Sequence, residues 1–300
     1  GLIGFAIYTK EGFPDRYAVT PKKGVILFEE YPHPRKNSNC HDVYSDLSGE
    51  VWSCLLSKSD LADVAIIGDS HAQQYYQSFA KNLPNKSVLN ISMPGCLPFV
   101  SDELINKYCS NHDKILSFLK SQKSIKEIYL TGYWSYLAAG FKFGNIEGQR
   151  VADDLNDSNV ESFVRNGRNV ISELIDSDKD LTIIRDIPDL IFKPMACLTI
   201  TSDYLSKLRV NTINFDGIKV GDSCVIDKKK FTQRNQPFDD LLNIFISDFP
   251  SVSVLDPKEI LCEDGQCFVF KDGLPLYYDS DHLTIEGADY ATQHLLKENK

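Results

Sequence analysis

Positive charge is scarce in this sequence. Lys and Arg together number 32 against 42 Asp and Glu, which gives a formal net charge of −10. Nucleic acids and anionic lipid surfaces bind clustered Lys and Arg. Only Lys228, Lys229 and Lys230 form a basic run, and we interpret it as a solvated turn. The charge balance therefore argues against nucleic acid or anionic lipid as a main partner.

The sequence also lacks a long hydrophobic run and a cleavable signal peptide. Residues 1–8 are apolar, but as a helix they would span only about 12 Å, far less than a bilayer. We interpret this segment as the last turns of a membrane helix, and a short buried strand fits its composition equally well. The chain is 42% hydrophobic and 25% charged, so it can form a sizeable core.

Zinc-binding patterns are missing, although the chain has eight cysteines. There is no C-x₂-C spacing and no His at ligand distance from a Cys. Cysteines in even number and in loop-like stretches favour disulfides and an oxidising compartment over reduced cytosolic thiols. We expect local pairs, although the sequence alone permits many others. The expected pairs are Cys40–Cys54, Cys96–Cys109, Cys197–Cys224 and Cys262–Cys267.

From residue 61 onward, short β-branched runs alternate with helical segments. The runs are nearly all apolar, as in strands covered on both faces, and comprise residues 63–68, 87–91, 127–131, 181–187 and 251–255. Helices are expected over residues 70–83, 111–122, 158–177, 234–248 and 284–298. This alternation predicts an α/β fold, a three-layer α/β/α sandwich of flavodoxin type with a five-stranded parallel sheet.

Two stretches of the sequence lack a sustained helical or strand pattern of apolar residues. Residues 1–60 are rich in turn residues, and we expect a membrane-proximal linking region that packs on the domain through Cys40 and Cys54. Residues 190–232 contain Gly, Pro and Cys without helical or strand patterning. We interpret them as an insertion in a domain that covers residues 61–300.

The first predicted strand runs directly into Gly68-Asp69-Ser70-His71-Ala72 and then into a helix. Strand-to-helix turns at the carboxyl edge of a parallel sheet are where such folds bind ligands. Ser70 then lies at a helix N-terminus, where backbone N–H groups can stabilise an oxyanion. Gly221-Asp222-Ser223 repeats the tripeptide, but no helical pattern follows it, and we interpret that copy as a turn. The context therefore favours Ser70 as a nucleophile.

A serine nucleophile needs a base, and the segment Tyr278-Asp279-Ser280-Asp281-His282-Leu283 offers one just before the last helix. Asp279 precedes His282 by three residues, so one loop can carry both groups. His282 would take the proton of Ser70 while Asp279 holds its tautomer. A lone loop His is usually a surface residue, but its combination with Asp279 and Ser70 favours a Ser-His-Asp triad.

These two blocks resemble the SGNH hydrolase superfamily. The closer resemblance is to SGNH domains fused behind the acyltransferase-3 (AT3) membrane domain in bacterial O-antigen acetyltransferases. It is carried by residues 68–72, by Cys262 and Cys267, and by residues 275–284. Residues 12–16 also resemble the segment after the last membrane helix of that family. The resemblance covers the whole chain and is specific in the two end blocks.

The resemblance implies an oxyanion hole built from the amides of Ser70 and Gly95 and from a third donor. The asparagine that supplies this donor in the family is absent, because Thr131-Gly132-Tyr133-Trp134 follows the third strand. A Trp near this point is similar to the AT3-fused branch. The indole N–H of Trp134 is a candidate donor, and packing of Trp134 in the core is the alternative.

Three further side chains are candidates for substrate contact: His71, Tyr133 and Tyr278. The tyrosines could stack on sugar rings or simply fill core and rim. His71 could instead be an exposed residue of the first helical turn. We expect no metal site.

The resemblance implies an O-acetyltransferase domain on the periplasmic side of the bacterial inner membrane, within an integral membrane protein. The fused AT3 domain would take acetyl from acetyl-CoA, and this domain would bind no cofactor itself. It would pass the acetyl group through an acyl-Ser70 to a sugar hydroxyl of a surface glycan, the lipopolysaccharide O-antigen. The alternatives are an SGNH carbohydrate esterase that uses water and a non-catalytic glycan-binding module.

Overall fold

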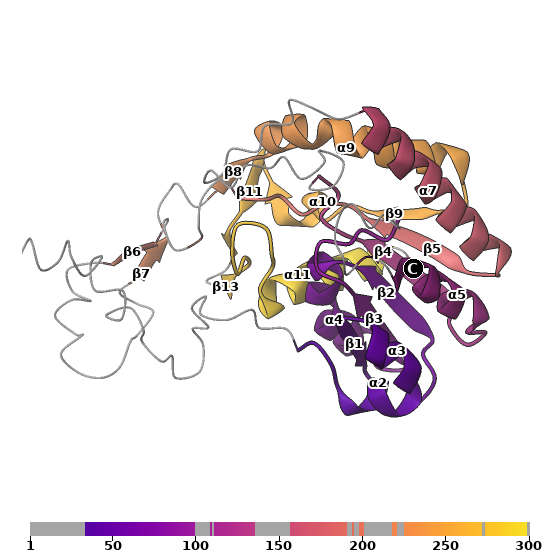
Figure 1. Cartoon of the computed structure of the whole chain (residues 1–300). Coiled ribbons are helices and arrows are strands. Elements are labelled where there is room, and N and C mark those ends of the chain that lie inside the picture. Colours follow the sequence, from indigo (N-terminus) through magenta and orange to yellow (C-terminus); the bar gives the residue numbers. More distant parts are fainter. Residues whose placement is uncertain are drawn as a thin grey trace, which may run out of the picture. The chain divides into compact units, whose positions relative to one another are not determined.

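The computed structural model describes residues 34–99, 109, 111–135, 157–190, 194, 198–200, 218–220, 225–271 and 274–298. The chain divides into two units, Gly1–Tyr31 with Ile200–Lys219 and Pro32–Thr199 with Val220–Lys300. The main sheet, its helices and the candidate site all belong to the second unit (Figure 1). Within the described residues, no helix has the length and apolarity needed to cross a membrane.

The main sheet contains six strands. In spatial order they are β1 (Ser53–Leu56), β3 (Val88–Ser92), β2 (Val64–Gly68), β4 (Glu127–Thr131), β5 (Asp180–Ile184) and β9 (Ser253–Leu255). The last five run parallel, while β1 is antiparallel to β3 at the edge. Numbered along the chain, the parallel strands follow the order 2-1-3-4-5, which is the flavodoxin order. The predicted fold is confirmed, with β1 as an additional strand.

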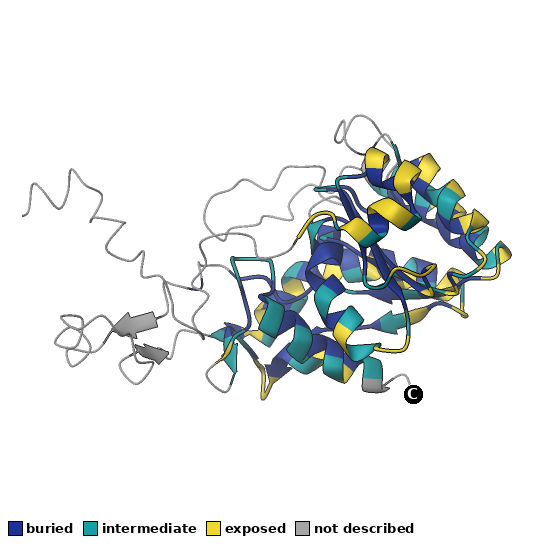
Figure 2. Ribbon diagram, turned by 90° about the horizontal axis from the view of Figure 1, so that it is seen from below, coloured by how far each residue is buried: buried dark blue, intermediate teal, exposed yellow. Residues whose placement is uncertain are grey.

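Helices cover both faces of this sheet (Figure 1). Alternate residues of β2 point to opposite faces, so Val64 and Ile66 join one buried cluster while Ala65 and Ile67 join the other. The first cluster includes α4 (Ser70–Asn82) and α11 (Ile285–Glu298). The second includes α5 (His112–Ser121), α7 (Asp157–Asp176) and most of the buried residues of α9 (Lys228–Asp248). Figure 2 shows the buried sheet between helices whose outer sides are exposed.

Helix α9 begins six residues before its expected start at residue 234. The side chain of Asp227 caps it by accepting a hydrogen bond from the backbone N–H of Lys230, at 3.0 Å. Lys228, Lys229 and Lys230 therefore form the first turn of a helix, and their interpretation as a solvated turn is wrong. Lysines at a helix N-terminus oppose the helix dipole, which is why the charge pattern concealed this start.

Part of the expected linking region lies within the sheet and its covering layer. Residues 38–56 form α2 (Ser38–Val43), α3 (Ser45–Glu50) and β1. The Cys40–Cys54 disulfide joins α2 to β1. Asn37 connects the same elements, because its side-chain oxygen accepts from the backbone N–H groups of Cys40 and Leu56, at 3.0 and 3.1 Å. The segments 1–8 and 12–16 lie outside the described residues.

Three of the expected disulfides are present: Cys40–Cys54, Cys96–Cys109 and Cys262–Cys267. Cys197 and Cys224 lie outside the described residues, as does most of the expected insertion.

Short strands complete the fold. β6 (Leu198–Ile200) pairs with β7 (Ile218–Val220), and β8 (Val225–Asp227) pairs with β11 (Gln266–Phe268), which also pairs with β10 (Cys262–Glu263). β12 (Phe270–Lys271) pairs with β13 (Leu274–Pro275), and the short helix α10 (Lys258–Leu261) precedes β10.

The end of β2 lies so close to β4 that only glycine fits there. A Cβ atom added at Gly68 would lie 1.7 Å from the carbonyl oxygen of Thr131. Gly49 is exposed in helix α3, and a Cβ atom added there would have no atom within 4 Å.

Gly68→Ala should lower the free energy of unfolding by about 1–3 kcal/mol, because β2 and β4 must separate to admit the methyl group. Gly49→Ala should leave stability unchanged or raise it by up to about 1 kcal/mol, since Ala favours helix. Urea denaturation of both variants checks this, and equal effects at the two positions would contradict it.

Candidate active site

Ser70 is the first residue of α4, directly after the carboxyl end of β2. Its Oγ lies 2.7 Å from Nε2 of His282. On the other side of the ring, Nδ1 lies 3.0 and 3.1 Å from the two carboxylate oxygens of Asp279. A carboxylate can only accept, so Nδ1 carries the proton and Nε2 accepts from the Ser70 hydroxyl. The structure thus brings together the three residues of the predicted triad, with hydrogen bonds in the order Ser70–His282–Asp279.

The loop that carries Asp279 and His282 is fixed from within. Oδ1 of Asp279 accepts the backbone N–H groups of Asp281 and His282, at 2.9 and 2.7 Å. The backbone N–H of Tyr278 donates to the carbonyl of His282, at 2.8 Å. Asp279 therefore both orients the imidazole and closes the turn that carries it.

Neighbouring elements hold the same loop from outside. The backbone N–H of Leu283 donates to the side-chain oxygen of Gln74 on α4, at 2.7 Å. The backbone N–H of Leu190, in the segment after β5, donates to the carbonyl of Ser280, at 2.6 Å. The loop is thus attached both to the helix that begins with the serine and to the segment that follows β5.

Asp69 links the turns that follow β2 and β4. Oδ1 accepts the backbone N–H of His71 at 2.8 Å, and Oδ2 accepts that of Tyr133 at 2.9 Å. The side chain is buried, and burial raises the pKa of Asp69, although the nearby His71 and His282 act in the opposite direction. Sequence reasoning gave Asp69 no role. Its place directly before the helix was a usable signal, because Asp is a preferred N-cap.

Trp134 packs in the core, which was one of its two predicted roles, the other being an oxyanion donor. Its side chain is buried against Phe99, with ring centroids 5.3 Å apart. The indole N–H donates to the carbonyl of Ile184, at 2.8 Å. This bond occupies the indole's single donor, which contradicts Trp134 as a source of the third oxyanion donor. Asp186 fixes the same segment by accepting the backbone N–H of Trp134, at 3.0 Å.

Gly95 lies where the sequence places it, after β3, the strand beside β2. Its φ of 66° is in the left-handed region, which glycine adopts without strain. The backbone N–H of Met93 donates to the carbonyl of Gly68 at 2.9 Å and so ties the end of β3 to the end of β2. The role of the Gly95 amide in an oxyanion hole stays a prediction.

His71 is buried, at 2% exposure, so the alternative of an exposed first-turn residue is wrong. Its ring stacks on Tyr133, with centroids 4.6 Å apart and planes at 11°. Tyr133 and Tyr278 are each partly exposed. The burial of His71 leaves little of its surface for direct substrate contact, while both tyrosines remain candidates.

Electrostatics favour the protonated form of His282. Burial alone lowers the pKa of this ring, but the hydrogen bond to Asp279 and the charges of Asp281, Asp279 and Asp69 together raise it above its ordinary value. The imidazolium that forms when Ser70 loses its proton is therefore stabilised in place.

Among the described residues, His71, Asp281 and His282 offer donor atoms within 4.8 Å of one another, close enough to hold a metal ion. Both ring nitrogens of His282 already take part in hydrogen bonds, to Asp279 and to Ser70. An ion would have to displace one of these partners, so we assign no metal site.

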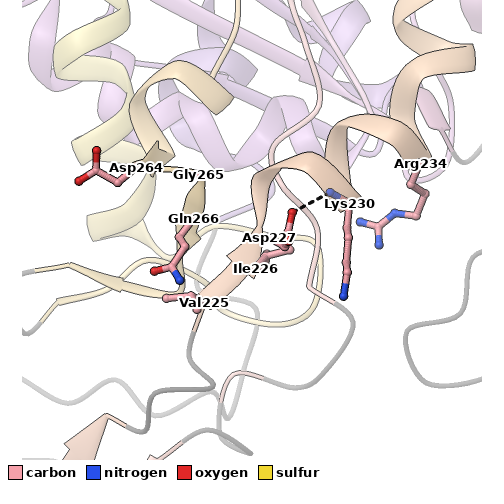
Figure 3. Close-up of a pocket in the computed structure, with 8 residues that line it drawn as sticks. All are labelled: Val225, Ile226, Asp227, Lys230, Arg234, Asp264, Gly265 and Gln266. Atoms are coloured by element: carbon pink, nitrogen blue, oxygen red, sulfur yellow. Dashed lines mark hydrogen bonds between the residues drawn. The ribbon is translucent and has the colours of Figure 1, made fainter.

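A separate hollow of about 530 Å³ lies beside β8, the β10–β11 turn and the first turns of α9 (Figure 3). None of the triad residues lines it. Arg234, which does, forms an ion pair with the buried carboxylate of Asp189. Asp189 directly precedes Leu190, which holds Ser280, so the wall of the hollow and the triad loop are connected.

The family model described as "SGNH domain (fused to AT3 domains)" matches residues 35–297. No curated protein matches the chain. Among solved structures, the chain is similar to the lipopolysaccharide acetyltransferase periplasmic domain of Salmonella ser. Paratyphi A. The identity is 15%, the match covers 81% of this chain and 85% of that one, and the TM-score is 0.50.

Two esterase structures are more distant. A carbohydrate acetylesterase from Sinorhizobium meliloti is 12% identical, with 79% of this chain and 97% of that one covered and a TM-score of 0.42. An aryl esterase from M. smegmatis is 11% identical over the same shares, with a TM-score of 0.43. At these identities, the similarity to the Salmonella domain indicates a shared fold only. The lower similarity to the two esterases indicates nothing about the activity of this chain.

Asp279→Asn should lower the pKa of His282, because it removes a charge and an acceptor that raise it. NMR titration should place the wild-type ring above the ordinary value of about 6.5 and the variant below the wild type. The charge on His282 then stabilises the fold fully below the ordinary pKa, and this contribution is lost as pH rises through the folded value.

Asp264→Asn is the matched control, since Asp264 is exposed in the β10–β11 turn. It should leave the His282 midpoint unchanged. A midpoint that does not move in Asp279→Asn would contradict the assigned role of Asp279.

Proposed function

The chain belongs to the family of SGNH domains fused to AT3 domains, and from this premise we propose that it is a serine-dependent O-acyltransferase. Ser70 is the nucleophile, His282 the general acid and base, and Asp279 the residue that orients His282. The observation that carries the proposal is the short hydrogen bond between Ser70 Oγ and His282 Nε2, 2.7 Å long, backed by Asp279 at Nδ1.

The first half-reaction loads the serine. His282 takes the proton of Ser70 as Oγ attacks the carbonyl carbon of the acyl donor. The tetrahedral oxyanion is stabilised by the amide of Ser70, at the N-terminus of α4, and by that of Gly95. When the intermediate collapses, the bond to the leaving group breaks and His282 returns the proton to it. Ser70 is left as an ester.

The second half-reaction unloads it. A hydroxyl of the acceptor gives its proton to His282 and attacks the acyl carbon, and the same amides hold the second oxyanion. Collapse transfers the acyl group to the acceptor, and His282 returns the proton to Oγ of Ser70. The raised pKa of His282 stabilises the imidazolium in both half-reactions, when the ring holds the proton of Ser70 and when it holds the proton of the acceptor hydroxyl.

For the substrates, we propose an acetyl group and a sugar hydroxyl of a bacterial surface glycan, such as the lipopolysaccharide O-antigen. The fused AT3 membrane domain is the proposed partner that delivers acetyl from cytoplasmic acetyl-CoA, and the proposed location of this domain is the periplasmic face of the inner membrane. Three observations support this: the fusion that defines the family, the similarity to a lipopolysaccharide acetyltransferase domain of Salmonella, and disulfides that suit an oxidising compartment. Tyr133 and Tyr278, at the rim of the site, are the proposed sugar contacts.

Ser70→Ala should lower acetyl transfer by about 10⁴ to 10⁶, because the chain loses its nucleophile. Ser223→Ala, in the second Gly-Asp-Ser, is the matched control and should retain activity. The full-length protein should be tested for acetylation of its glycan, and the isolated domain for hydrolysis of a chromogenic acetate ester.

Three outcomes would contradict the proposal in different ways. Acetylation that survives Ser70→Ala removes Ser70 as nucleophile and favours a glycan-binding module. Rapid Ser70-dependent ester hydrolysis without transfer to any glycan favours the esterase. Equal losses at Ser70 and Ser223 would show that the effect is not specific to the site.

A further inference from the structure

A second imidazole lies against the first. The ring of His71 is packed between two other rings: it stacks on Tyr133, and its centroid lies 4.7 Å from that of His282. The backbone N–H of His71 is held by Asp69 at 2.8 Å. The side chain is 3% exposed, so the ring has little freedom to move. None of the steps of acyl transfer uses His71, although it touches the catalytic base.

Asp281 lies between the two imidazoles. Its Oδ2 is 3.5 Å from Nε2 of His71 and 3.7 Å from Nδ1 of His282. The hydroxyl of Ser280 donates to its other oxygen, at 2.8 Å. The side chain of Asp281 is 19% exposed, so its charge is only partly screened by water.

Nε2 of His71 is buried and makes no hydrogen bond to any described residue. A buried nitrogen left in this state costs free energy, which an attraction to the nearby carboxylate of Asp281 offsets. The pairing also affects which carboxylate accepts the hydrogen bond from Nδ1 of His282. Asp281 Oδ2 is only 3.7 Å from the nitrogen that donates to Asp279, so an unrestrained Asp281 could compete for that proton.

We propose that His71 and Asp281 are positioning residues and form a second imidazole–carboxylate pair beside the triad. The ring of His71 holds the ring of His282 toward Ser70, and the carboxylate of Asp281 stabilises the positive charge that His282 takes up. His71 keeps the carboxylate of Asp281 on its own side, so Asp279 alone accepts from Nδ1, and the His71 ring blocks rotation of His282. This inference rests on the proposed roles of Ser70 and His282.

Several groups act on His282 from the elements around it. Asp279 and Asp281 lie on its own loop, Asp69 lies in the turn before α4, and His71 and Ser70 lie in the first turn of α4. Tyr133, which follows β4, stacks on His71. Of these, Asp281 is a carboxylate that raises the pKa of His282 without bonding to the ring. Its removal therefore changes charge while the hydrogen bonds of the triad stay in place.

The test is a double-mutant cycle with a near-isosteric change and a ring-preserving one. Asp281→Asn removes the charge, and His71→Phe keeps a stacking ring without nitrogens. Each single variant should lower kcat about tenfold with little change in KM, and the double variant should be no worse than a single one, because the two residues act as a unit. His71→Ala should lose more than His71→Phe, since it also removes the ring that supports His282.

The pH readout separates positioning from a merely structural role. In Asp281→Asn the acid limb of kcat should move to lower pH, while Asp264→Asn should leave it in place. Additive losses in the double variant, or an acid limb in Asp281→Asn that coincides with the wild type, would overturn the inference. Circular dichroism of each variant identifies any that fails to fold.

A titration without catalysis keeps the inference separate from the proposed function. NMR of the His282 ring in a Ser70→Ala background should show a lower midpoint once Asp281→Asn is added, whether or not the wild type transfers acyl groups. An unmoved midpoint overturns the pairing even in an active enzyme. If the His282 midpoint shifts but the wild-type protein has no acyl-transfer or esterase activity, the pairing is supported and the proposed function is contradicted.

Discussion

The hydrogen bond between Ser70 and His282 joins residues 212 positions apart, and much of the domain serves to hold its two ends together. Ser70 begins α4, and the His282 loop leads into α11, so the packing of these two helices sets the distance between base and nucleophile. They share one buried cluster, and Ser78 on α4 donates to the carbonyl of Ala288 on α11, at 3.0 Å. The triad is thus assembled by helix packing over one face of the sheet.

The position of the serine follows from the topology of the sheet. β2 lies between β3 and β4, so the chain crosses from β2 to β3 on one side and then from β3 to β4 on the other. In open parallel sheets, ligands bind at the carboxyl ends of the strands where the strand order reverses in this way. Gly68 lets the chain turn beside the Thr131 carbonyl, and Asp69 fastens this turn to the one after β4. The same buried carboxylate caps α4 and aligns Tyr133 under His71. One side chain therefore organises the nucleophile, the rim tyrosine and the second imidazole.

Much of the fold could be predicted because its strands are short apolar runs with a helix after each. The five parallel strands, the placement of Ser70 after the first of them and the Asp279/His282 pairing all depend on local patterns. β1 was missed because its four residues lie in a turn-rich segment and show no strand period. Contacts with α2 hold it, namely the Cys40–Cys54 disulfide and the hydrogen bonds of Asn37. The start of α9 was missed because three lysines mask an Asp cap.

What could not be predicted depends on contacts between distant segments. His71 occupies a first-turn position that is usually exposed, and it is buried because Tyr133, from the end of another strand, covers it. Trp134 could be assigned to the core only once its indole N–H was seen to reach Ile184. By sequence, Asp281 is one of two acidic residues in its loop, and only the structure places it between two imidazoles.

The most direct measurement is mass spectrometry of the peptide that contains Ser70, after the domain has reacted with an acetyl donor in the absence of an acceptor sugar. An acetyl ester on Ser70 that forms rapidly and disappears when acceptor is added is the predicted result. Acetyl transfer that proceeds while Ser70 stays unmodified, or an acetyl group found only on another residue, would contradict the central role of Ser70.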